Sequence, residues 1–292
     1  MKMVRDYIIS LRIRQWIKNL FIFAPILFSL NFTNIIYLKN SIIAFFLFSL
    51  VAGNIYVLND IIDRNSDIHH PRKKFRPIAS RSLGLLQASV LSIFILAITL
   101  ITGFVFNRDF FLISIIYIGI NILYSLYLKN MAVFDVIIIG IGFVLRVMIG
   151  GKINKIYLSP WLFIITFLLA LFLGLVKRRQ EVVLSENSGI ENTRIALKNY
   201  SIPFLDQLIS ITTSATLISY IIYVLNPDIQ NYFHTKELYL TVPFVIFGIF
   251  RYLFLTYIKQ KGENPEEVIF TDIPFLINII LWVGVFVILI YK

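Results

Sequence analysis

Residues 41–67 read SIIAFFLFSLVAGNIYVLNDIIDRNSD, an apolar run that ends in acidic and amide side chains. Residues 41–60 are long and apolar enough to cross a membrane as a helix, which takes about 20 residues. Asp60, Asp63 and Asp67 are spaced i, i+3 and i+7, so on a helix the three carboxylates share one face. The stretch therefore predicts a membrane-spanning helix with an acidic site at its end.

The composition of the whole chain is that of an integral membrane protein. Of its 292 residues, 58% are hydrophobic and only 15% are charged, against about 25% charged in soluble domains. The absence of cysteine excludes disulfides, zinc–thiolate sites and thiol catalysis. The net charge of +11 comes from short basic clusters between apolar runs, which indicates cytoplasmic loops beside anionic lipid and no nucleic-acid partner.

The apolar windows predict an all-α bundle of nine transmembrane helices that forms one domain over residues 1–292. The first window follows basic residues, as in a signal peptide, but no small-residue cleavage site follows Leu30, so we expect a retained helix. The predicted spans are 17–37, 41–60, 83–106, 110–128, 133–151, 160–176, 203–225, 238–258 and 272–291.

The distribution of basic residues predicts the orientation. Of the 27 Lys and Arg residues, 19 fall in the N-terminal segment and in the loops after the second, fourth, sixth and eighth windows. The positive-inside rule then puts the N-terminus and the charged motifs at the cytoplasmic face of the inner membrane. With nine spans, the C-terminus is expected outside.

The acidic motif predicts a magnesium site. Closely spaced carboxylates repel one another unless a cation lies among them, and Mg²⁺ is commonly bound by one or two carboxylates plus substrate phosphates. The predicted metal ligands are Asn59, Asp60, Asp63 and Asp67, and the three aspartates are also the predicted catalytic residues. The alternative is an ordinary solvated helix end in which Asp63 and Asp67 pair with nearby basic residues.

Basic side chains follow the acidic motif and others gather at further points of the chain. They suit a phosphorylated ligand, because Arg offers forked donors to phosphate oxygens. The predicted substrate-binding residues are Arg72, Lys73 and Arg76 after the motif, Arg14, Gln15, Lys18 and Asn19 near the N-terminus, Tyr124, Lys129 and Asp135 around the fourth loop, Arg146 in the fifth window, and Lys177, Arg178 and Glu181 after the sixth.

Several of these residues also have ordinary explanations. Tyr124 and Lys129 could be interfacial anchors, and Lys177 and Glu181 could form an i, i+4 pair. An intramembrane Arg146 needs a partner or a polar cavity, and Asp135, about three turns away on the same helix, is too far for direct pairing.

Taken together, the motifs resemble those of the UbiA superfamily of intramembrane prenyltransferases. The resemblance is carried by the acidic motif at 59–67, by HPRKKFRPIA at 70–79 and by the later polar residues. The RQWIKN motif at 14–19 and GENPEE at 262–267 are similar to the branch that transfers phosphoribosyl groups to polyprenyl phosphates. Asp135 has no second aspartate four residues away, which also favours that branch over the aromatic prenyltransferases.

The resemblance implies a UbiA-like fold, Mg²⁺ as cofactor, and phosphoribosyl diphosphate and a polyprenyl phosphate lipid as substrates. The implied reaction transfers the 5-phosphoribosyl group to the lipid phosphate and releases diphosphate. Two alternatives remain open at this point: an aromatic prenyltransferase that uses prenyl diphosphate, and a small transporter with polar residues near the bilayer midplane. The sequence also leaves open a homo-oligomer.

Overall fold

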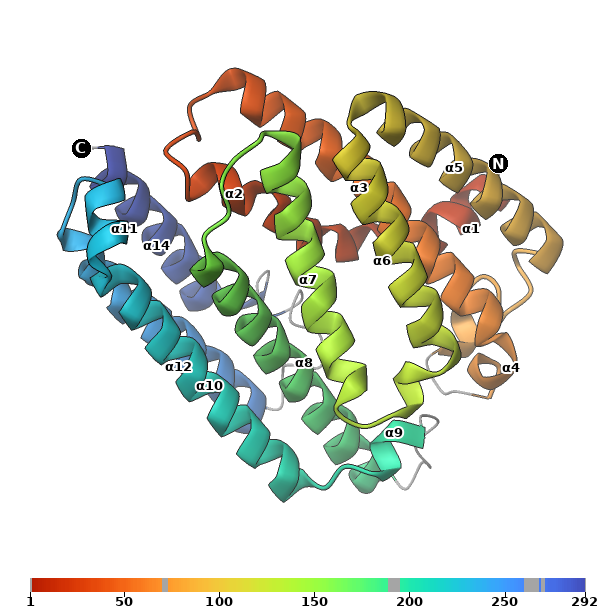
Figure 1. The fold of residues 1–292 in the computed structure, drawn as a ribbon. Helices are drawn as coiled ribbons and strands as arrows, with labels where there is room; N and C mark the ends of the chain where they lie inside the picture. The colour runs from red at the N-terminus through yellow and green to blue at the C-terminus, as the bar shows by residue number, and fades with distance from the viewer. Residues whose placement is uncertain (1, 70–72, 189–194, 260–267, 269–270, 292) are drawn as a thin grey trace. The chain divides into compact units, whose positions relative to one another are not determined.

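Every regular element in the computed structural model is a helix over the residues that it describes, which are 2–69, 73–188, 195–259, 268 and 271–291 (Figure 1). The elements are α1 (Lys2–Ser10), η1 (Ile13–Phe23), α2 (Ala24–Leu27), α3 (Ile35–Ile62), α4 (Arg64–Asp67), η2 (Lys73–Phe75), α5 (Leu85–Phe106), α6 (Arg108–Leu126), η3 (Leu128–Asn130), α7 (Phe134–Ile153), α8 (Pro160–Ser188), α9 (Ile195–Lys198), α10 (Ile202–Leu225), α11 (Pro227–Tyr232), η4 (Glu237–Thr241), α12 (Val242–Tyr257) and α14 (Ile273–Tyr291).

Within this described part, eight helical segments are long and apolar enough to cross a membrane. They are α3, α5, α6, α7, α8, α10, the continuous segment from η4 through α12, and α14. The expected all-α membrane bundle is confirmed, whereas the expected number of nine spans is not.

The difference lies in the first predicted window, 17–37, which is not one helix. Its residues form the 3₁₀-helix η1, the short α2 and a turn before α3. Pro25 has no N–H to donate and its ring crowds a preceding turn, which suits its place in the first turn of α2 and not the interior of a longer helix. The window is therefore as hydrophobic as a span, but its chain changes from 3₁₀ to α geometry next to Pro25.

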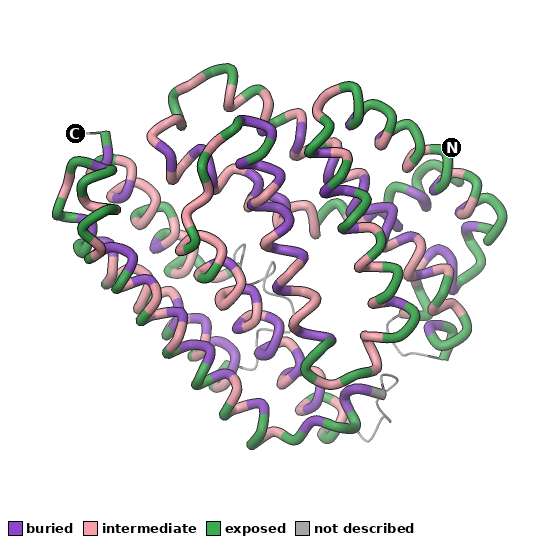
Figure 2. Tube along the Cα trace, in the orientation of Figure 1, coloured by how far each residue is buried: buried purple, intermediate pink, exposed green. Residues whose placement is uncertain are grey.

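Contact clustering divides the chain into two compact units, and α3 is central to the first, which comprises residues 1–26, 32–131 and 145–157. Within this unit α3 packs against α1, η1, α5 and α6. The most apolar window of α3 is 56% buried and that of α5 only 17%. In Figure 2 the buried residues of the chain are purple and the exposed ones green. Asn34 caps the start of α3, where its side chain accepts hydrogen bonds from two backbone N–H groups of the first turn.

The segment η1 lies close to the last part of α7 within the same unit. A Cβ atom at Gly150 would lie 2.0 Å from the carbonyl oxygen of Ile22, so only glycine permits this approach. Asn19 of η1 also donates a hydrogen bond to Ser49 of α3 at 2.8 Å. These contacts hold η1 beside α3, with its N-terminal end at the acidic end of α3.

The second unit comprises residues 27–31, 132–144 and 158–292. Here α8 packs on α10, and α12 packs on α14. One hydrophobic cluster joins α8, α10 and α12 around Phe172 and Tyr252, and another gathers around Phe286 of α14. The helix α7 contributes its first half to this unit and its second half to the first. That the whole chain forms one domain stays a prediction.

Candidate functional site

The acidic motif lies where α3 ends and the short α4 begins, in the first unit. Asp60 is in the last turn of α3, and Asp63 has left helical geometry with φ −86° and ψ 2°. Asp67 is the last residue of α4. Asp60 and Asp67 lie on one side, as their i, i+7 spacing predicts, whereas Asp63 contacts a separate partner.

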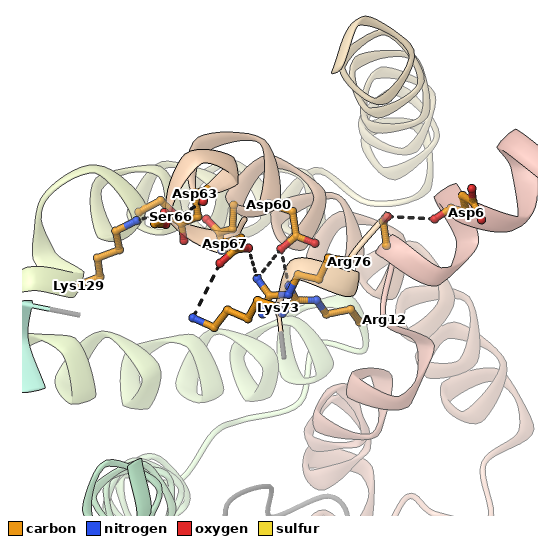
Figure 3. Close-up of polar contacts among 12 residues, drawn as sticks. Asp6, Arg12, Asp60, Asp63, Ser66, Asp67, Lys73, Arg76 and Lys129 are labelled. Carbon is orange, nitrogen blue, oxygen red and sulfur yellow. Dashed lines mark hydrogen bonds and ion pairs between the residues drawn. The ribbon is translucent and has the colours of Figure 1, made fainter. Parts of the chain in front are cut away.

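Asp60 and Asp67 nevertheless converge on the same cation (Figure 3). Arg76 Nη1 lies 3.0 Å from Asp60 Oδ1 and 2.6 Å from Asp67 Oδ2. Arg12 Nη2 contacts the same Asp60 oxygen at 2.5 Å, and Lys73 Nζ lies 3.9 Å from Asp67 Oδ1. The side chains of the two aspartates are only 2% and 3% exposed, so the cations cover them.

Asp63 and Asn59 have different partners. Asp63 pairs with Lys129 of η3, and its side chain is 30% exposed. Asn59 accepts a hydrogen bond from Ser125 of α6. The anticipated pairing of Asp67 with Lys73 is thus present, whereas Asp63 contacts Lys129.

The arrangement is compatible with a divalent cation. In the described part of the chain, no three acidic, histidine or cysteine side chains form a ready-made metal cluster. Two carboxylate oxygens of Asp60 and Asp67 do, however, point at one guanidinium nitrogen of Arg76, so they already share one positive centre. Two carboxylates are also the number that Mg²⁺ commonly takes from a protein when phosphates supply the rest.

The N-terminal motif is partly buried in the first unit. Asn19 accepts a hydrogen bond from Arg146 Nε at 2.8 Å, and Tyr117 accepts one from Arg146 Nη2 at 3.2 Å. Arg146 is 5% exposed, and its guanidinium also lies over the Tyr117 ring, 5.1 Å from the centroid. These contacts supply the partners that a buried arginine requires. Lys18 contacts Gln15.

A second polar cluster is built within the second unit from Asp135, Arg178, Glu181 and Tyr200. Arg178 Nε donates to Asp135 at 2.6 Å, and Arg178 Nη1 donates to Glu181 at 2.7 Å. Tyr200 donates to the other oxygen of Asp135 at 2.7 Å and accepts the N–H of Val133 at 2.6 Å. Burial raises the pKa of the Tyr200 phenol, so it stays protonated and remains a donor.

This second cluster changes the interpretation of two predicted residues. The side chains of Asp135 and Arg178 are 1% and 2% exposed and bonded to each other, so they brace α7 against α8. Glu181 pairs with Arg178 at i, i+3. Lys177 itself is half-buried on α8.

Two further predicted residues, Arg14 and Tyr124, belong to helices of the first unit. Arg14 is exposed at the start of η1, and Tyr124 is half-buried on α6. Arg72 and the 262–267 motif lie outside the described residues.

Sequence reasoning missed three residues that the structure places in these clusters. Arg12 is not among the predicted site residues, but it stands in the same basic stretch as Arg14, and that stretch is a signal for it. Ser125 and Tyr200 have no such signal in the sequence, because the role of a single hydroxyl depends on the partner that the fold brings to it.

Burial lowers the pKa of Arg12 from its ordinary value, while the charge of Asp60 acts to raise it.

Comparison with known proteins gives consistent relatives. The decaprenyl-phosphate phosphoribosyltransferase of Mycolicibacterium smegmatis is 29% identical over 97% of this chain and 91% of its own length. The protein of the same name from Corynebacterium glutamicum is 29% identical over 97% of this chain and 86% of its own length.

The fold is similar to a solved UbiA homologue from Archaeoglobus fulgidus bound to GPP and Mg²⁺. The TM-score is 0.70 at 19% identity, over 98% of this chain and all of that one, which confirms the expected UbiA-like fold. Residues 20–280 match the model of the UbiA prenyltransferase family. Since this match covers most of an all-helical membrane protein, the chain belongs to the UbiA prenyltransferase family.

Proposed function

We propose that this protein transfers the 5-phosphoribosyl group of phosphoribosyl diphosphate to a polyprenyl phosphate, with Mg²⁺, and releases diphosphate. The observation that carries the proposal is the convergence of Asp60 and Asp67 on Arg76, with Arg12 and Lys73 as further cations at the two carboxylates. Relatives of nearly the same length that are named decaprenyl-phosphate phosphoribosyltransferases support the choice of substrates.

In this proposal Asp60 and Asp67 hold the metal, and Asn59 and Asp63 complete its surroundings. When bound, Mg²⁺ neutralises charge on the diphosphate leaving group. Arg76 is displaced from the two carboxylates and then binds phosphate oxygens, for which its forked donors are suited.

The donor brings about three phosphate groups, so the site needs several cations. Lys73 lies beside Asp67 and can bind the diphosphate end. We assign the 5-phosphate to Lys129, which is 17% exposed and pairs with Asp63. In this proposal the basic side chains bind the phosphate groups of the donor, in addition to neutralising the aspartates.

The chemical step needs no proton transfer. The bond between ribose C1 and a diphosphate oxygen breaks, and the diphosphate leaves with the bonding electron pair. A bond between C1 and an oxygen of the lipid phosphate forms, and that phosphate is already ionised near neutral pH. A site of aspartates, lysines and arginines therefore suffices, and its fixed charges stabilise the departing diphosphate.

We also propose that the acidic site faces the cytoplasm, with the N-terminus inside and the C-terminus outside. In the first unit the basic residues gather at the end of α3, as the positive-inside rule requires. The 11 residues of η1 and four of α2 rise about 28 Å together, close to the roughly 30 Å of a hydrocarbon core. With this broken segment as a further crossing, the chain crosses the membrane nine times, which puts the N-terminus and the C-terminus on opposite sides.

The proposal is tested by supplying membranes that contain the protein with radiolabelled phosphoribosyl diphosphate and a polyprenyl phosphate. We expect Mg²⁺-dependent label in the lipid fraction, loss of that label with EDTA, and no label from membranes of the Asp60→Ala variant. Absence of lipid label from active, correctly inserted protein would contradict the proposal.

A second candidate is prenyl transfer from a prenyl diphosphate to an aromatic acceptor. The structural neighbour bound to GPP and Mg²⁺ favours it, because that ligand is a prenyl diphosphate. The same membranes supplied with labelled prenyl diphosphate and an aromatic acceptor separate the two functions, and label in the acceptor would establish the second.

A further inference from the structure

Arg12 has an unusual backbone conformation for its residue type. Its φ of 51° and ψ of 59° lie in the left-handed region, which is sterically unfavourable for residues with a Cβ atom. Such conformations persist where surrounding contacts hold them and often occur at functional sites. The conformation here turns the chain between α1 and η1 and directs the side chain to the end of α3.

The guanidinium of Arg12 is held by two residues one turn apart on α3. It contacts Asp60 Oδ1 at 2.5 Å and lies over the ring of Tyr56, 4.9 Å from the centroid. The Arg12 side chain is 28% exposed, and that of Asp60 is 2% exposed. Arg12 therefore lies between the solvent and the carboxylate.

Two arginine side chains contact one carboxylate oxygen of Asp60. The oxygen that Arg12 contacts also receives Arg76 Nη1 at 3.0 Å, and Arg76 alone already joins Asp60 to Asp67. Two guanidinium groups at one oxygen repel each other, and both occupy the space that a metal ligated by that oxygen needs. One of the two is thus in excess until a further anion enters the site.

We propose that Arg12 is an exchangeable cation, which covers Asp60 in the ligand-free protein and moves to phosphate oxygens when a divalent metal and diphosphate bind together. The inference rests on the proposed function, and it adds Arg12 to the residues that bind the diphosphate group. Asp60 exchanges the guanidinium of Arg12, as it does that of Arg76, for the metal, and the displaced Arg12 gains a new anionic partner.

The exchange makes a specific thermodynamic prediction. A bare divalent cation must displace Arg12 without giving it a new partner, so the metal alone binds weakly. Diphosphate supplies that partner, so metal and diphosphate strengthen each other's binding by the same factor. Removal of the Arg12 charge should therefore change the two affinities in opposite directions.

The experiment measures Mn²⁺ binding by electron paramagnetic resonance on the purified full-length protein in nanodiscs, with and without inorganic diphosphate. For Arg12→Gln we expect Mn²⁺ alone to bind about threefold to tenfold tighter, because a charge-assisted hydrogen bond no longer competes. Diphosphate in the presence of Mn²⁺ should bind about tenfold weaker, because its charged partner is lost. Arg12→Lys keeps the charge without the fork and should lie between wild type and Arg12→Gln in both measurements.

Arg251→Gln is the matched control, since Arg251 also pairs with an aspartate and is likewise 28% exposed, but belongs to the second unit. It should leave both affinities unchanged. If Arg12→Gln and Arg12→Lys weaken both affinities, or change neither, the exchange is overturned and Arg12 is only a structural pair. If Asp60→Asn binds Mn²⁺ as wild type does, or wild type binds none, the metal assignment of the proposed function fails with it.

Discussion

Substitution of Asp135 by Asn tests the buried cluster of the second unit. Asp135 receives hydrogen bonds from two sides, from Arg178 Nε at 2.6 Å and from the Tyr200 hydroxyl at 2.7 Å. The amide of Asn has the same shape but only one oxygen, so its NH₂ group must face one of these donors. Tyr200 already accepts the Val133 N–H at 2.6 Å, which commits its hydroxyl to donating toward residue 135.

The expected loss of stability follows from these contacts. Breaking a buried ion pair costs about 3–5 kcal/mol when the remaining charge has no compensation. Arg178 keeps Glu181 at 2.7 Å, which moderates the loss. We therefore expect Asp135→Asn to lower the free energy of unfolding by about 3 kcal/mol, at the low end of that range.

The assay is equilibrium unfolding in mixed micelles by titration with sodium dodecyl sulfate, and the adjacent arginine provides the control. Arg179 contacts Asp206 at 2.5 Å, and Tyr257 donates to Asp206 at 2.6 Å, so the same three residue types meet again. This Asp206 side chain is 36% exposed, whereas that of Asp135 is 1% exposed. Asp206→Asn should cost at most about 1 kcal/mol, as exposed pairs do.

Equal losses of unfolding free energy in Asp135→Asn and Asp206→Asn would refute the reasoning, because burial of the aspartate would then not determine the loss.

A double variant extends the test. Replacement of Asp135 by Leu together with Arg178 by Met removes both charges at once, and such apolar replacements of buried pairs are often neutral. We expect the double variant to be more stable than Asp135→Asn, and a lower stability would show that the pair itself is indispensable.

Three further predictions concern the first unit. Asp60→Ala and Asp63→Ala should each abolish Mg²⁺-dependent turnover in the radiolabel assay while the protein still inserts into membranes; near-normal turnover in either would remove that residue from the metal site. Lys129→Met should raise the KM for phosphoribosyl diphosphate about tenfold with a smaller change in kcat, because it removes a cation that binds the donor in its ground state; steady-state kinetics with an unchanged KM would exclude that contact. Asn19→Leu removes the acceptor of Arg146 and should lower the free energy of unfolding by about 1–3 kcal/mol in the detergent titration, and a loss below about 0.5 kcal/mol would show that Arg146 finds another partner.

The position of the acidic motif could be predicted from the sequence, but its geometry could not. Its position at the end of a membrane-spanning helix was predicted, because the apolar run and the polar residues after it are local features. Its internal geometry was not, because the helix ends at Asp63 and turns this carboxylate toward Lys129, 66 residues away along the chain. Only tertiary packing determines which distant cation meets which aspartate.

The first predicted span shows a complementary limit. Its hydrophobicity is sufficient for a membrane helix, and hydropathy alone does not distinguish α from 3₁₀ geometry. Pro25 and the approach of Ile22 to Gly150 bear on the actual path of the chain. All three residues are visible in the sequence, but the contact between Ile22 and Gly150 joins segments that only the fold brings together.

The amino-acid sequence is sufficient to predict an all-helical membrane protein with its charged motifs in a few polar segments, and to show its resemblance to the UbiA superfamily. These properties follow from hydropathy, charge and local spacing, which depend only on residues that are close together in the sequence. Tertiary structure alone decided that Arg12 and Arg76 share one oxygen of Asp60, that Arg146 rests on Asn19, and that Asp135 and Arg178 brace two helices. Partners for buried charges come from distant segments, because a charge removed from water must find its counterpart wherever the fold places one.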